Sequence, residues 1–232
     1  MNIFFVIFTC FICNINSIKI ISLQPGGLNG FYMFGISKYI KQNYILDHTN
    51  YYGASAGAWN ALYLSKKTGI STHSFQTYLE NLDVSKFENL YDIENSIKQF
   101  YLTHYQSSDF NLHQLHICVA QIKRFGIEKK IYSGFDDLED TIECCMASSH
   151  IPFITNNNLF FTYKNKLCVD GGFFQYPHTQ HIEPSLNLYP HIWDNPNIRK
   201  NKNIQQFNIS QNIMWGYQDA FFHKDELDMA LL

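Results

Sequence analysis

The sequence has little charge and no excess of basic residues. Only 16% of its 232 residues are charged, against about 25% in a typical globular chain, and the formal net charge is −3. Nucleic-acid-binding proteins carry basic patches that neutralise phosphates, so this balance argues against a nucleic-acid partner. The 20 Phe and 15 Tyr could indicate a surface that faces lipid, but Ile, Asn and Lys are abundant too, and a coding bias explains the pattern better. Composition alone therefore assigns no substrate.

The six cysteines form no framework. They are Cys10 and Cys13 in an apolar N-terminal run, the adjacent Cys144 and Cys145, and the isolated Cys118 and Cys168. No C-x-x-C pair has a matching His or Cys partner, which argues against a zinc site. We expect Cys118, Cys144 and Cys168 to be small buried apolar side chains.

The N-terminal apolar run is short for a membrane-spanning helix. Residues Ile3–Cys13 are apolar apart from Thr9, whereas a membrane-spanning helix needs about 20 such residues. A signal peptide would have this length, but a basic start and a clear small-x-small cleavage site are missing. Three interpretations stay open: a signal peptide, a membrane-associating segment, and a buried or artefactual extension. We therefore separate residues 1–17 from a single domain over residues 18–232, and the compartment stays open between secreted or membrane-associated and cytoplasmic.

Beyond that run, apolar periodicity predicts alternating strands and helices. Strands are expected at 18–23, immediately before Ser55, and at 116–122, 127–133, 159–163 and 166–170. Helices are expected at 30–42, 58–64, 71–82, 92–105, 136–148 and 211–231. This order predicts an α/β fold with a mainly parallel central sheet, and the length suits one domain. Residues 183–206, with three prolines and many Asn, are expected to be the least ordered.

The most informative motif is Gly53-Ala54-Ser55-Ala56-Gly57, a G-x-S-x-G between a predicted strand and a predicted helix. On a sharp strand–helix turn the serine hydroxyl projects from the backbone, while the two glycines let the turn close. The N-terminus of the following helix directs free N–H groups at whatever binds there. This geometry suits an acyl-transfer nucleophile, although a five-residue match can also be an ordinary turn.

Two further glycine-containing segments lie where such chemistry needs them. Pro25-Gly26-Gly27-Leu28-Asn29-Gly30 connects the first strand to the first helix, and backbone N–H groups there could approach an oxyanion. Asp170-Gly171-Gly172 ends an apolar strand and could present a carboxylate at a sheet edge. Taken singly, each segment could be an ordinary turn. The acidic run 136–140 could suggest calcium, but acidic residues in the first turn of a helix explain it better.

Taken together and in this order, the glycine loop, the G-x-S-x-G and the D-G-G resemble the patatin-like phospholipase family. Residues 27–35 are similar to the adiponutrin-like branch, and residues 147–153 resemble the family's A-S-x-x-x-P segment. The resemblance covers about residues 18–178. It implies a three-layer α/β/α fold with a mainly parallel central sheet, hydrolysis of acyl esters of phospholipids or neutral glycerides, and transient contact with a membrane or lipid surface.

The resemblance also implies roles for individual residues. Ser55 would be the nucleophile and Asp170 its base, and the backbone N–H groups of Gly26, Gly27 and Leu28 would form the oxyanion hole. The motif glycines would be Gly30, Gly53, Gly57, Gly171 and Gly172. The family's Ser–Asp dyad requires no metal or cofactor. In such a dyad Ser55 Oγ is expected roughly 2.6–3.2 Å from an Asp170 oxygen, with no histidine between them.

Two departures and two alternatives accompany this interpretation. Pro25 replaces the first glycine of the family's G-x-G-x-x-G, and Asn29 stands where Arg or Lys is frequent. One alternative is a catalytically inactive lipid-binding protein whose loop Pro25 distorts. The other is an α/β-hydrolase with a Ser-His-Asp triad, since His178 and His181 follow Asp170 in the order that this fold uses. Hydrolase and transacylase share the same acyl-enzyme, so the sequence does not separate them.

Overall fold

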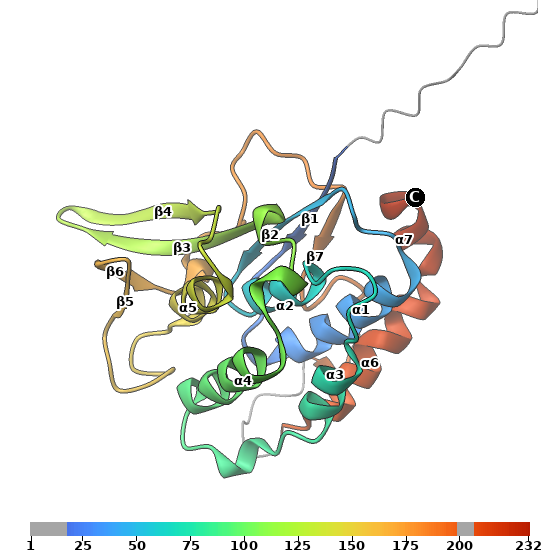
Figure 1. Ribbon diagram of the computed structural model, residues 1–232, viewed down its shortest axis with the longest axis horizontal. Coiled ribbons are helices and arrows are strands. Elements are labelled where there is room, and N and C mark those ends of the chain that lie inside the picture. Colours follow the sequence, from blue (N-terminus) through green and yellow to red (C-terminus); the bar gives the residue numbers. More distant parts are fainter. Residues whose placement is uncertain (1–17, 199–206) are drawn as a thin grey trace, which may run out of the picture.

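One seven-stranded sheet forms the centre of the fold (Figure 1). The computed structural model describes residues 18–198 and 207–232, in which the strands are ordered β5-β6-β3-β2-β1-β7, with β4 paired to β3. The strands are β1 (Lys19–Leu23), β2 (Thr49–Ala54), β3 (Leu115–Lys123), β4 (Gly126–Tyr132), β5 (Phe161–Tyr163), β6 (Lys166–Val169) and β7 (Leu186–Leu188). Only β4 and β6 run against β3, so the sheet is mainly parallel.

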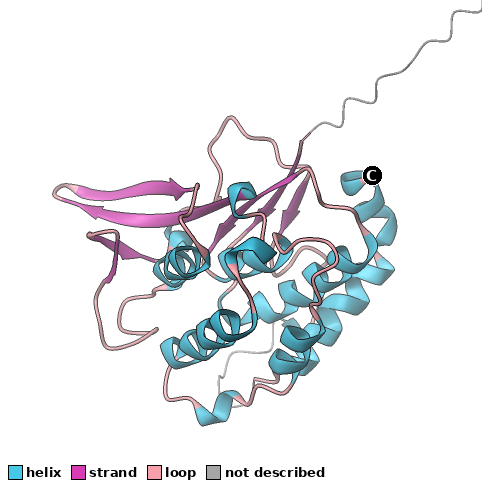
Figure 2. Cartoon of the chain, in the orientation of Figure 1, coloured by secondary structure: helices cyan, strands magenta, loops and turns pink. Residues whose placement is uncertain are grey.

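Helices flank this sheet, which Figure 2 shows as one group of magenta arrows beside the cyan helices. They are α1 (Gly30–Asn43), α2 (Ala56–Leu64), α3 (His73–Glu80), α4 (Leu90–His104), α5 (Leu138–Ser149), α6 (Ile209–Phe222) and α7 (Lys224–Leu231). Polar side chains fix several helix starts, because Asn89, Asp137 and Asn208 each accept a backbone N–H from the first turn. Across the described residues, every helix is too short or too polar to cross a membrane.

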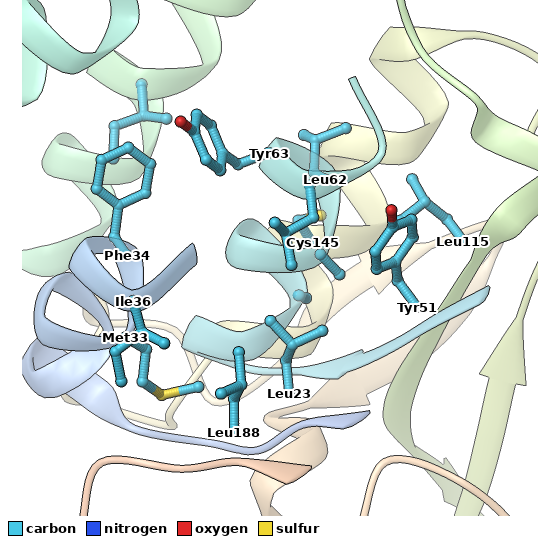
Figure 3. Packing of buried hydrophobic residues seen from close by; sticks show 14 of the residues in the cluster. Leu23, Met33, Phe34, Ile36, Tyr51, Leu62, Tyr63, Leu115, Cys145 and Leu188 are labelled. Carbon is cyan, nitrogen blue, oxygen red and sulfur yellow. The ribbon is translucent and has the colours of Figure 1, made fainter. Parts of the chain in front are cut away.

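The core lies between the sheet and the helices that cover it. Alternate residues of the central strands, such as Leu23, Tyr51 and Leu115, point into this layer and are fully buried (Figure 3). Met33 of α1 and Leu62 of α2 meet them from the helix side. This packing holds the C-terminal ends of β1 and β2 against the N-terminal ends of α1 and α2, which is where the sequence predicts the functional site.

Two glycines allow α1 and α6 to pack in close contact. A Cβ atom on Gly35 would lie 2.1 Å from the carbonyl oxygen of Ile213, and one on Gly216 would lie 1.9 Å from that of Tyr32. Neither distance is compatible with a real side chain, so the backbones can approach this closely only with glycine at both positions. The C-terminal helix is thereby fixed to the helix that follows the glycine loop.

The chain that follows Asp170 covers the other face of the sheet near β3, opposite the core described above. Tyr52 and His116 stack on this face with ring centroids 4.3 Å apart, and the His178 ring packs edge-on against Tyr52. Lys129 Nζ of β4 donates to the carbonyl oxygens of Tyr176 and His178. The segment after the D-G-G is therefore tied to the β3–β4 hairpin.

The structure confirms the predicted α/β fold with a mainly parallel central sheet, and it corrects two details of the element order. The first is β7, which lies in the segment expected to be least ordered and pairs in parallel with β1 through Ile21 and Leu186. The second is the predicted helix 211–231, which is two helices that meet at His223. The His223 ring stacks on Trp193 at 4.6 Å, a tertiary contact that coincides with the break. Residues 1–17, with their three open interpretations, lie outside the described residues.

Candidate active site

The register of three strands brings Ser55 and Asp170 together. β2 runs parallel to the first half of β3, and its last residue, Ala54, pairs with Cys118. β6 runs antiparallel to β3, and its last residue, Val169, pairs with Ala120. Because β4 occupies the other edge of β3, β2 and β6 share one edge and meet end to end. The residues that follow the two strands therefore face each other, although they are 115 positions apart.

Ser55 occupies a strained turn between β2 and α2. Its backbone angles, φ 55° and ψ −129°, lie in a region that residues other than glycine rarely adopt. The flanking glycines are required by close contacts: a Cβ on Gly57 would lie 2.0 Å from the carbonyl oxygen of Leu23, and one on Gly53 would lie 2.6 Å from that of Gly57. Such a turn pushes the serine side chain out of the sheet and above its edge.

A second serine, Ser148 of α5, links this turn to β3. The backbone N–H of Ser55 donates to Ser148 Oγ at 2.8 Å, and Ser148 Oγ donates to the carbonyl oxygen of Cys118 at 2.6 Å. Ser148 is fully buried at the end of α5. Sequence reasoning placed it in the A-S-x-x-x-P resemblance without a role, and the structure shows that it fixes the backbone of Ser55.

The hydroxyl of Ser55 donates to Asp170. The distance from Ser55 Oγ to Asp170 Oδ2 is 2.7 Å, which confirms the predicted contact. The other carboxylate oxygen accepts the backbone N–H of Gly172, and the backbone N–H of Asp170 donates to the carbonyl oxygen of His150 at 2.7 Å. Burial raises the pKa of Asp170 from 3.8 to about 6, although the hydrogen bonds from Ser55 and Gly172 lower it in part. The carboxylate is consequently a stronger base than a solvated aspartate.

The histidines named for a triad do not join this pair. Within the described residues, no histidine side chain hydrogen-bonds to Ser55 or Asp170. His178 Nδ1 lies 3.0 Å from the carbonyl oxygen of Thr179, and its ring packs against Tyr52 on the second face of the sheet. His150 meets the site only through its carbonyl oxygen, and His181 is exposed. Within the described residues, Ser55 and Asp170 are therefore in direct contact without a bridging histidine.

The glycine loop lies beside this pair. Gly27 has φ +51°, a value that suits glycine, and it opens the 3-10 turn η1 (Gly27–Asn29). The N–H groups of Gly27 and Leu28 precede the first hydrogen bond of that turn, so they are free to bind a ligand. Both residues line one cavity together with Ser55. The Pro25 ring packs on Gly172, where a Cβ would lie 2.9 Å from it, so the departure at Pro25 has a structural partner.

An apolar cavity of about 120 Å³ opens beside Ser55. Its walls come from the glycine loop, α1, α2, α3, α4, and the end of α5 with Ile151 after it. Phe75 and Leu79 of α3, and Ile93 and Ile97 of α4, supply much of the hydrocarbon surface. The helices α3 and α4 therefore close one side of this cavity.

One lining residue that the sequence analysis did not single out is Glu94. It lies on the stripe of α4 that also carries Leu90, Ile93, Ile97 and Tyr101, at helical spacing. An acidic residue within an apolar stripe was the available signal, because such a position normally faces the core.

The acidic run at 136–140 forms the start of a helix, as the sequence indicated, since Asp137 Oδ1 accepts the N–H of Asp140 at 2.8 Å.

Comparison with known proteins identifies the family. The family model for patatin-like phospholipase matches residues 21–178, which is more than half of the 232 residues and spans the glycine loop, Ser55 and Asp170. No curated protein matches the chain. The similarity to the adiponutrin-like branch stays a prediction. The chain therefore belongs to the patatin-like phospholipase family, a family of lipid acyl hydrolases.

Proposed function

We propose that this protein is a serine acyl hydrolase that cleaves acyl esters of phospholipids or neutral glycerides through a Ser55–Asp170 dyad. The observation that carries the proposal is the 2.7 Å hydrogen bond between a serine on a strained turn and a desolvated carboxylate. The apolar cavity beside Ser55 supports a hydrocarbon substrate, because it offers an acyl chain a dry environment next to the nucleophile.

The first half of the reaction forms an acyl-enzyme. Ser55 Oγ attacks the ester carbonyl carbon while its proton passes to Asp170, and the carbonyl oxygen becomes an oxyanion. The N–H groups of Gly26, Gly27 and Leu28 stabilise that oxyanion, a contribution of about 3 kcal/mol per well-placed donor. Collapse of the intermediate breaks the bond to the alcohol oxygen, which takes the proton from Asp170 as the alcohol leaves.

The second half returns the enzyme to its starting state. Asp170 removes a proton from a water molecule, whose oxygen attacks the acyl carbon, and the same N–H groups stabilise the second oxyanion. Collapse releases the fatty acid, and the proton held by Asp170 returns to Ser55 Oγ. Burial of Asp170 helps both halves, because a carboxylate with a pKa of about 6 accepts a proton more readily than one with a pKa near 3.8.

Covalent labelling tests the assignment directly. A fluorophosphonate probe should label the wild-type protein, and Ser55→Ala should abolish both labelling and hydrolysis of p-nitrophenyl octanoate. Asp170→Asn should reduce both by roughly 10³-fold or more, since an amide cannot accept the serine proton. Ser65→Ala is the matched control, because Ser65 is a buried serine at the end of α2 that donates only to the carbonyl oxygen of Leu62.

The same measurements separate the alternative functions. A wild-type protein that folds but neither reacts with the probe nor turns over any ester would favour the inactive lipid-binding alternative. Retention of hydrolysis by Ser55→Ala would contradict the assigned nucleophile. Loss of activity in His178→Ala or His181→Ala as severe as in Ser55→Ala would favour the triad. Analysis of products with an added alcohol acceptor distinguishes hydrolysis from transacylation.

A further inference from the structure

A carboxyl group lies in the mainly apolar wall of the cavity. Glu94 lines it beside Ile93 and Ile97, and its Oε1 is hydrogen-bonded to Ser149 Oγ. Its other oxygen, Oε2, is buried and has no hydrogen-bond partner within the described residues. Buried polar atoms in native proteins are nearly always paired, so an unpaired oxygen in a ligand cavity indicates that a ligand group pairs with it. None of the steps proposed above uses this oxygen.

The hydrogen-bond partners of Ser149 define the state of Glu94. A serine hydroxyl has one proton to donate and can accept two hydrogen bonds. Trp59 Nε1 can only donate and lies 3.2 Å from Ser149 Oγ, whereas the Cys145 carbonyl oxygen can only accept and lies 2.8 Å away. Each of these three contacts contains one proton when Ser149 donates to the Cys145 carbonyl oxygen and Glu94 Oε1 donates its own proton to Ser149. Glu94 is then a neutral carboxylic acid, and Oε2 is its carbonyl oxygen.

The electrostatic environment agrees with a neutral acid. Burial raises the pKa of Glu94 to about 8, with a smaller increase from Asp170, and hydrogen bonds that Ser149 and Trp59 would donate to the ionised carboxylate only partly offset this rise. At pH 7 Glu94 therefore offers an uncharged hydrogen-bond acceptor in a mainly hydrocarbon wall. A neutral donor suits it best, because a cationic group would have to lose its hydration among Phe, Leu and Ile side chains.

We propose that Glu94 Oε2 binds a hydroxyl group of the substrate, so that the preferred substrates are hydroxylated lipids. The hydroxyl could belong to the acyl chain or to the glycerol of a partly deacylated lipid, and the chemistry of recognition is the same. The inference rests on the proposed function and names the substrate class of that site. A hydrocarbon at this position would leave Oε2 unpaired, whereas a hydroxyl pairs with it, and sites built in this way discriminate strongly against the analogue that lacks the group.

Two matched pairs of esters distinguish the sources of the hydroxyl. The first compares p-nitrophenyl octanoate with p-nitrophenyl esters of 3-, 6-, 7- and 8-hydroxyoctanoic acid. The second compares 1-octanoylglycerol with its dimethyl ether. For each we would measure kcat/KM on the wild-type protein and Kd on Ser55→Ala, which binds an ester without turning it over. At least one pair should favour the hydroxylated member by about tenfold or more in both quantities.

Substitutions at Glu94 assign any preference to its carboxyl group. Glu94→Leu should abolish the preference, because leucine has neither donor nor acceptor. Glu94→Gln should keep it within about threefold, because its amide N–H can donate to Ser149 and its carbonyl oxygen replaces Oε2. Glu88→Leu is the control, since Glu88 is exposed and lies outside the cavity wall. Glu94→Gln also keeps the test valid if Glu94→Leu fails to fold.

The outcomes separate this inference from the proposed function. Equal kcat/KM and Kd within both pairs would overturn the inference while leaving the hydrolase assignment intact, and so would an undiminished preference in Glu94→Leu. If the wild-type protein turns over no ester, the hydrolase assignment fails. The Kd values on Ser55→Ala then still decide whether Glu94 binds a hydroxyl.

Discussion

At the scale of single residues, the proposed role of Asp170 as the base predicts the pH range in which the protein works. A base must be ionised to accept a proton, and burial raises the pKa of Asp170 to about 6. We therefore expect kcat/KM for a soluble ester to be constant above pH 7 and to fall as the pH decreases through about 6, by about tenfold per pH unit below it. Stopped-flow assays at constant ionic strength, with circular dichroism to verify folding, would measure this. A rate that stays flat down to pH 4.5 would contradict Asp170 as the base.

The same burial means that the ionised carboxylate of Asp170 destabilises the folded protein. Its pKa is higher in the folded protein than the ordinary value of 3.8, so between pH 3.8 and 6 the folded state binds more protons than the unfolded state. Stability is therefore lost as the pH rises through this window, by an amount that corresponds to about 3 kcal/mol.

Asp170→Asn removes this charge, so it should raise the free energy of unfolding at pH 7.5 by up to about 3 kcal/mol and have little effect near pH 4. Urea unfolding at the two pH values tests this. A less stable variant at pH 7.5 would show that the hydrogen bonds of the carboxylate outweigh its desolvation.

At the scale of elements, the contact between α1 and α6 depends on two glycines. Glycine lowers helix stability by about 1 kcal/mol relative to alanine, so Gly216→Ala would be stabilising if only helix propensity mattered. A Cβ at Gly216 would instead lie 1.9 Å from the Tyr32 carbonyl oxygen, and overpacking of this kind costs about 1–3 kcal/mol or more.

We therefore expect Gly216→Ala to lower the free energy of unfolding by at least about 1 kcal/mol. Gln218→Ala, at an exposed position of the same helix, should stay within about 0.5 kcal/mol of the wild type. Thermal and urea unfolding of the two variants give the comparison, and a stabilised Gly216→Ala protein would mean that α6 can move away from α1.

The elements also show which features a sequence can reveal. Long segments with clear periodicity, such as α1 and β3, were predicted because local pattern and tertiary burial agree in them. β7 was missed because it has only three residues and its place depends on pairing with β1, which lies far away in the sequence. The break between α6 and α7 was missed because no Gly or Pro marks His223, and its ring is held by Trp193.

The residues of the candidate site also differ in whether a local motif reveals them. Ser55, Asp170 and the glycine loop were predicted, because each belongs to a short motif whose local geometry is tied to chemistry. Ser148 and Glu94 were not assigned roles, because their importance depends on which strand or cavity they meet after folding. For Glu94, the only local signal was an acidic residue within the apolar stripe of α4.

At the scale of the whole molecule, an exposed apolar loop lies beside the cavity. Ile151 lines the cavity, and Phe153 and Ile154 beside it are 68% and 62% exposed. The loop is anchored next to α4, because the N–H of Tyr91 donates to the Thr155 carbonyl oxygen at 3.0 Å. We infer that Phe153 and Ile154 contact the lipid surface while an acyl chain enters.

This inference predicts separate effects on binding and on chemistry. The double variant Phe153→Asn and Ile154→Ser should reduce binding to phosphatidylcholine vesicles by about tenfold or more, because two large apolar side chains no longer enter the interface. Asparagine suits the positive φ of Phe153, so the loop conformation is kept. Hydrolysis of a soluble p-nitrophenyl ester should change less than twofold.

Met229→Ser is the control for that experiment. Met229 is 83% exposed but lies on α7, away from α4 and α5 (Figure 1). Vesicle sedimentation and ester assays would be made on the same preparations. Equal loss of vesicle binding in the control, or none in the double variant, would show that the loop is not the contact.

The end-to-end meeting of β2 and β6 on one edge of β3 has a consequence for inactivation by heat. Ser55 follows β2, a strand that lies between two others in the sheet, whereas Asp170 follows a hairpin strand that pairs with β3 at only two residues, Ala120 and Gln121. Partial opening of that hairpin would separate the two groups while the helices stay folded. On warming, esterase activity should therefore disappear several degrees before the far-ultraviolet circular dichroism signal, and recover on cooling as long as the helices have not melted.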